Sequence, residues 1–124
     1  MQTVIETPTF IQAARRVGMS EAEVLALVDF LATTPEAGDP MQSTGGCRKV
    51  RIAGRGKGKS GGYRTVHYNG ADDVPVLLLV VMDKGDRDNL NQAERNELRQ
   101  LMQTYETEYR AGVRGKVTTL AEGA

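Results

Sequence analysis

Two segments near the start of the chain show the three- and four-residue spacing of apolar positions that is typical of amphipathic helices. In the first, Thr7-Pro8 has the form of an N-cap followed by proline at the first helical position, and Gly18 ends the segment. In the second, Ser20 and Glu23 have the spacing of a capping box. The N-terminal third is therefore predicted to be helical, after a short strand over residues 2–6.

From residue 47 the pattern changes to the two-residue alternation of half-buried strands. Cys47–Ala53 and Tyr63–Tyr68 alternate in this way, and a glycine-rich segment joins them. A turn at Asn69-Gly70 is followed by Val76–Met82, an unbroken apolar run that predicts a central strand covered on both faces. Because the connections are short, we expect these strands to form an antiparallel meander.

A final helix is predicted to begin at Asn91, which repeats the capping pattern with Glu94. Apolar residues that recur along its expected buried face are Leu98, Leu101, Met102, Tyr105 and Tyr109. The expected fold class is α+β, with two N-terminal helices, an antiparallel three- to four-stranded sheet and a C-terminal helix. We expect one domain over residues 1–112 and a flexible tail over residues 113–124, where no apolar period continues.

The composition excludes several classes of protein. The chain of 124 residues has one cysteine, Cys47, and one histidine, His67, which are too few for an internal disulfide or a metal site. We therefore expect no metal and no cofactor. No apolar run is long enough to cross a membrane, and the first residues lack the pattern of a secretory signal. These features predict a cytoplasmic protein with no membrane partner.

The net charge of zero hides a strong segregation of charge. Between residues 45 and 69 there are seven basic residues and no acidic one, whereas the rest of the chain has 9 basic and 16 acidic residues. The seven are Arg48, Lys49, Arg51, Arg55, Lys57, Lys59 and Arg64. Basic side chains neutralise phosphates, and glycine lets a backbone approach a polyanion closely. This segment is predicted to bind nucleic acid.

Within this segment, residues 53–60 nearly match a phosphate-binding P-loop, since Gly58-Lys59-Ser60 fits its end. A P-loop leads into a helix whose N-terminus faces the phosphates. Here the sequence continues with Gly61-Gly62 and a strand pattern, so nucleotide hydrolysis is disfavoured.

The order of these motifs resembles that of the RelE/ParE superfamily of toxins, and more narrowly its HigB-like members. The residues that carry the resemblance are Gly45-Gly46, Arg48-Lys49, Arg51, Gly56-Lys57-Gly58-Lys59, Gly61-Gly62, Arg64, Lys84 and Leu90. The likeness extends over roughly residues 4 to 110. It implies the toxin of a type II toxin–antitoxin system, which cuts mRNA in the ribosomal A site. The implied partners are the ribosome, mRNA and a cognate antitoxin, typically a helix-turn-helix protein like HigA.

RNA can be cut without metal when its own 2′-hydroxyl attacks the adjacent phosphorus, provided that the protein moves the protons and stabilises the charge. On this requirement and the resemblance, Lys59 is our candidate general base, because neighbouring cations lower the pKa of a lysine. Lys57 is the alternative base or a phosphate contact. Arg64 would clamp the scissile phosphate, and Lys84 would stabilise or protonate the leaving group.

The remaining candidates bind RNA or the ribosome. Arg48, Arg51 and Arg55 would contact flanking phosphates or ribosomal RNA. Tyr68 shares a strand face with Arg64 by two-residue alternation, so it could stack on a base or donate a proton. His67 alternates to the other face and is expected to be a packed, hydrogen-bonded residue.

Two other functions stay open from the sequence. One is a ParE-like toxin that inhibits DNA gyrase, although its relatives usually lack the basic glycine loop. The other is a catalytically inactive RelE-like binding module, because the strand ends in Met82-Asp83-Lys84. Relatives commonly have an aromatic ring before that lysine.

Overall fold

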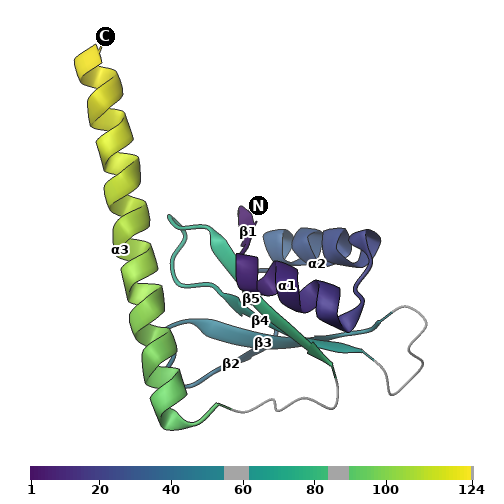
Figure 1. The fold of residues 1–124 in the computed structure, drawn as a ribbon. Helices are drawn as coiled ribbons and strands as arrows, with labels where there is room; N and C mark the ends of the chain where they lie inside the picture. The colour runs from purple at the N-terminus through teal and green to yellow at the C-terminus, as the bar shows by residue number, and fades with distance from the viewer. Residues whose placement is uncertain (55–61, 84–89, 124) are drawn as a thin grey trace.

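The structure is a computed structural model that describes residues 1–54, 62–83 and 90–123, with side chains as far as residue 113. A five-stranded sheet lies at its centre (Figure 1). Helices α1 and α2 cover one face of this sheet, and α3 packs against the other face near one end of the central strands (Figure 1). The strands are β1 Val4–Glu6, β2 Asp39–Pro40, β3 Cys47–Ile52, β4 Tyr63–Tyr68 and β5 Val76–Asp83, and the helices are α1 Pro8–Val17, α2 Glu21–Thr33 and α3 Gln92–Gly123.

The α+β class and the antiparallel meander of β3, β4 and β5 are confirmed, but the sheet has five strands instead of three or four and is not entirely antiparallel. Its strand order is β1-β5-β4-β3-β2, and β1 runs parallel to β5. The short run at β1 can pair this way because two helices separate it from the rest of the sheet. The middle strand is therefore β4. Strand β5 still has a neighbouring strand on each side, β1 and β4. The apolar run of β5 is explained by the helices that cover both faces of the sheet.

The capping signals of the N-terminal helices are confirmed. The Thr7 hydroxyl accepts a hydrogen bond from the Phe10 amide, and Ser20 and Glu23 form a reciprocal capping box. Gly18 ends α1 in the left-handed conformation, at φ 79°. The Thr7 hydroxyl also donates to the Leu78 carbonyl at 2.9 Å, which fixes the start of α1 on β5.

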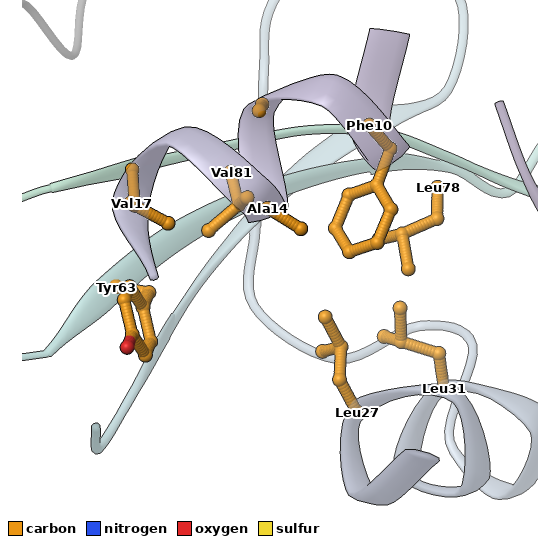
Figure 2. Packing of buried hydrophobic residues seen from close by; sticks show 9 residues of the cluster. Phe10, Ala14, Val17, Leu27, Leu31, Tyr63, Leu78 and Val81 are labelled. Carbon is orange, nitrogen blue, oxygen red and sulfur yellow. The ribbon is translucent and has the colours of Figure 1, made fainter. Parts of the chain in front are cut away.

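Between α1, α2 and the sheet lies the main hydrophobic core. Figure 2 shows Leu27 and Leu31 of α2 pointing toward Phe10 of α1 and Leu78 of β5. Tyr63, at the start of β4, packs in the same core. A second cluster on the opposite face packs β3, β4 and β5 against α3 through Cys47, Val66, Tyr68, Leu77 and Met102. Both faces of the central strands are thus buried near the end where α3 lies.

The predicted start of α3 is confirmed, since Asn91 and Glu94 cap each other's backbone amides. One other expectation for this helix is wrong. Leu101 is 56% exposed and does not lie on the buried stripe, because α3 contacts the sheet along a narrower face than the sequence pattern indicates. The backbone is helical as far as Gly123. The division into a domain and a tail stays a prediction.

His67 is buried, as expected, at 0% exposure. Its Nε2 lies 2.8 Å from the Pro35 carbonyl oxygen, so the neutral ring donates there and links β4 to the loop after α2. Its Nδ1 is buried with no hydrogen-bond partner among the described residues. Burial lowers the pKa of His67 below its ordinary value, outweighing the carbonyl contact.

We expect this histidine to make the fold less stable in mild acid. Because its pKa is lower in the folded state, the unfolded chain binds a proton first as the pH falls below about 6.5. The His67 contribution is thus complete above that pH and declines below it. In thermal unfolding between about pH 5 and 8, His67→Gln should lose less stability on acidification than the original chain. Equal slopes for both proteins would contradict the assignment.

Candidate nucleic-acid interface

Residue alternation in β3 and β4 divides the basic side chains between the two faces of the sheet. Arg51 and Arg64 are directly opposite each other across the two strands, and Arg64 is in turn opposite Met82 of β5. Directly paired residues point to the same face. Val66 and Tyr68 belong to the cluster beneath α3, so this is the α3 side of the sheet. Arg51 is exposed and Arg64 half-buried.

Arg51 and Arg64 place two positive charges side by side on this face. Such a concentration of cations favours contact with a polyanion. The two residues stand at the end of β3 and the start of β4, where the glycine-rich segment joins these strands. The structure thus brings two predicted phosphate-binding residues together on one surface.

Arg48 does not belong to this surface. It is three positions before Arg51 on the same strand, and it therefore faces the side covered by α1 and α2. Its guanidinium donates to the carbonyl oxygens of Ala37 and Gly38, at 3.1 and 2.8 Å. The predicted RNA contact has no support from this position. Arg48 instead holds the loop that leads into β2.

Tyr68 shares the face of Arg64 as predicted, but it lies under α3 and is only 3% exposed. Its hydroxyl donates to Glu106 Oε1 at 2.6 Å, and its ring meets the edge of Tyr105. Burial, reinforced by the Glu106 carboxylate, raises the pKa of Tyr68 well above its usual value. A ring and proton held in this way are not available to RNA here, so Tyr68 is a packing residue in this structure.

A second set of polar contacts extends the attachment of α3. Arg110 makes a bidentate ion pair with Asp73, in which Nε and Nη2 donate to the two carboxylate oxygens at 2.8 and 2.9 Å. Its Nη1 also donates to Glu106 Oε2 at 3.4 Å. The Tyr105 hydroxyl donates to the Pro75 carbonyl at 2.8 Å. These contacts fasten the middle of α3 to the turn between β4 and β5. The opposite end of the sheet face, where Arg51 and Arg64 lie, is outside this attachment.

A hollow of about 450 Å³ opens between the first half of α3 and the sheet. Its wall is almost entirely apolar and includes Val66, Met82, Leu98 and Met102. Since Met82 is opposite Arg64 across the strands, the hollow borders the arginine pair. Apolar and cationic surfaces therefore adjoin on this face, as the base and phosphate of a nucleotide require.

Four predicted residues lie outside the described residues. They are Arg55, Lys57, Lys59 and Lys84. Their predicted roles as base, phosphate contacts and leaving-group stabiliser stay predictions. The described chain reaches the two ends of the segment that holds the first three, at Gly54 and Gly62.

The sequence reasoning gave no individual role to two cations on this side of the molecule. Lys49 is two residues before Arg51 and so faces the same way. Arg95, in the first turn of α3, lies close enough to line a common hollow with Lys49. The strand alternation could have identified Lys49. Nothing in the sequence indicated that Arg95 would lie beside it.

Metal sites and membrane-spanning helices are absent from the part of the chain that the structure describes. Among the side chains that the structure describes, in residues 1–54, 62–83 and 90–113, no group of three or more His, Cys, Asp or Glu could hold a metal ion. The same stretches contain no helix long and apolar enough to span a bilayer. Burial raises the pKa of the Cys47 thiol to about 11, which keeps it uncharged.

A comparison with protein families gives a match over residues 2–119. The matching family is described as the RelE toxin of the RelE / RelB toxin–antitoxin system. The match includes all five strands and the helices α1 and α2, together with α3 as far as residue 119.

Substitution of Tyr68 tests the attachment of α3. Tyr68→Phe removes the hydrogen bond to Glu106 and should lower the free energy of unfolding by about 1–2 kcal/mol. Tyr109→Phe is the matched control, because its hydroxyl makes no hydrogen bond among the described residues. It should change stability by less than about 0.5 kcal/mol. Urea denaturation measures both, and equal losses would argue against the Glu106 contact.

Proposed function

Because the chain belongs to the RelE toxin family of toxin–antitoxin systems, we propose that it is an endoribonuclease that cuts mRNA in the ribosomal A site. The observation that carries this proposal is the pair Arg51 and Arg64 beside an apolar hollow. Arg51 lies at the end of β3 and Arg64 at the start of β4, and the glycine-rich segment with Lys57 and Lys59 connects these two strands. A nuclease of this kind acts in the cytoplasm, where ribosomes are.

The proposed reaction needs no metal ion. The 2′-hydroxyl of the RNA loses its proton to Lys59, or to Lys57, and its oxygen attacks the adjacent phosphorus. A 2′,3′-cyclic phosphate forms as the bond to the departing 5′-oxygen breaks, and Lys84 protonates that oxygen. Arg64 binds the non-bridging oxygens, where negative charge builds up in the transition state. A guanidinium suits this role because two of its N–H groups can bind two oxygens at once.

Arg51 is proposed to bind a neighbouring phosphate and to keep the RNA on this face. A patch of so few cations would bind free RNA weakly at physiological salt, since each phosphate contact is screened. The ribosome would supply the positioning of the substrate. Because the ribosome positions the mRNA, the nuclease itself needs only a small basic surface.

The family implies an antitoxin partner. We propose that this antitoxin is a helix-turn-helix protein like HigA. Such a protein encoded beside this gene, and co-purifying with this chain, would support the HigB-like subtype. An antitoxin of another DNA-binding class would contradict that subtype without affecting the nuclease proposal.

Arg64→Ala should lower the rate of mRNA cleavage on programmed ribosomes by about 100-fold or more, because it removes the charge that meets the transition state. Lys84→Ala should have an effect of similar size. Arg16→Ala is the control: Arg16 is an exposed cation in the last turn of α1, on the other side of the sheet, and its loss should leave cleavage unchanged. Thermal unfolding verifies that the variants are folded.

Full cleavage by Arg64→Ala and Lys84→Ala would overturn the assignment of these residues. Intact mRNA on ribosomes with the original chain would favour an inactive binding module. DNA damage on expression, with translation continuing, would favour gyrase inhibition instead.

A further inference from the structure

A polar hollow of about 290 Å³ lies between the first turn of α3 and the start of the β2–β3 pair. Lys49 and Arg95 supply its positive charge, and Gln42, Ser43 and Gln92 add polar side chains. No acidic residue is among the described residues that line it. We call this hollow the Lys49–Arg95 pocket.

Arg95 is held in place without being neutralised. Its Nε donates to the Leu90 carbonyl at 3.0 Å, and its Nη1 donates to the Gln42 carbonyl at 2.9 Å. Both acceptors are uncharged, and the remaining N–H donors of the guanidinium are not used by any described hydrogen bond. Arg110 shows the contrast, because the carboxylates of Asp73 and Glu106 meet its guanidinium. Arg95 is thus oriented and keeps its charge.

Lys49 connects the pocket to the arginine pair. It lies on the same face of β3 as Arg51, two residues away, which is about 7 Å along a strand. Its side chain is half-buried and makes no hydrogen bond or ion pair with the described residues. The one carboxylate opposite it is that of Asp39 on β2, which is exposed and makes no ion pair with it. The cations Arg64, Arg51, Lys49 and Arg95 therefore follow one another across this side of the molecule.

We propose that the Lys49–Arg95 pocket binds a backbone phosphate of an RNA strand whose scissile phosphate lies at Arg64. This inference rests on the proposed nuclease function and extends it. The pocket adds a fixed guanidinium, a lysine and the positive end of a long helix, and each of these favours a phosphate. A phosphate held here fixes the direction of the strand across the sheet, because Arg51 lies between the two positions.

The salt dependence of binding tests this proposal with the full chain. The probe is a short single-stranded RNA with methylated 2′-hydroxyls, which cannot be cleaved by 2′-attack, and fluorescence anisotropy gives its affinity over a range of salt. The slope of log affinity against log salt should become shallower by about 0.7 for each phosphate that Lys49→Gln/Arg95→Gln no longer neutralises. The control Arg15→Gln/Arg16→Gln removes the same charge from α1 and should keep the original slope.

Two further variants guard against an indirect effect on folding. Lys49→Gln alone leaves the Arg95 contacts intact, and it should still reduce the slope. Asp39→Asn removes the carboxylate opposite Lys49 and should raise the affinity. Thermal unfolding of each variant shows whether the loop held by Arg95 is preserved.

Sedimentation with ribosomes over the same salt range separates messenger RNA from ribosomal RNA. A shallower slope with free RNA indicates a phosphate of the substrate strand, and a shallower slope with ribosomes alone indicates ribosomal RNA. The first result supports the proposal, whereas the second would assign the pocket to ribosomal RNA and overturn its assignment to the substrate strand. Unchanged slopes in both assays, or no binding by the original chain in either, would overturn the proposal.

The test of the proposed function gives a separate answer. If Arg64→Ala abolishes cleavage while the pocket variants keep the original slope of log affinity against log salt, the nuclease proposal is supported and the pocket proposal is overturned. If the pocket variants reduce the slope but the original chain cuts no mRNA, the pocket binds RNA in a protein that is not a nuclease.

Discussion

The position of α3 on the sheet is the constraint on which the functional surface depends. The helix is fastened to one end of β4 and β5 by contacts of different kinds: the hydroxyls of Tyr68 and Tyr105, and the ion pair of Arg110 with Asp73. All of these lie near the turn between the two strands. The helix therefore covers the end of the face that holds Tyr68 and does not extend over the end that holds Arg64.

This arrangement explains why residues on a single strand face have different roles. Arg64, Val66 and Tyr68 alternate along β4, yet Tyr68 is buried beneath α3 while Arg64 is half-exposed. Val66, between them, lines the apolar hollow. The face thus passes from core to apolar hollow to cationic surface over three alternate residues. A nucleotide has the same succession of apolar base and charged phosphate.

Positive charge is concentrated at this surface, because Arg51 and Arg64 are direct cross-strand neighbours. A pair of neighbouring cations favours a ligand of opposite charge. Arg48, by contrast, is bound by two carbonyl oxygens and supports the loop before β2. Gly38 in that loop has a φ of 84°, and a Cβ there would collide with the Lys49 carbonyl, so only glycine fits.

The sequence by itself determined the elements, because their signals are local. Caps at Thr7, Ser20 and Asn91 fix where helices begin, and the strand over residues 63–68 was predicted with its observed bounds. Two-residue alternation also placed Arg64 and Tyr68 on one face and His67 on the other. Applied to β3, the same rule would have separated Arg48 from Arg51 and joined Lys49 to the site.

Only the tertiary structure decided what covers each face. The parallel pairing of β1 with β5, the burial of Tyr68 and the approach of Arg95 to Lys49 all depend on where distant segments pack. Tyr68 and Glu106 are 38 residues apart, and no local pattern encodes their contact. Periodicity states which side chains share a face, but exposure of that face depends on the long-range packing that places a helix over one end of it.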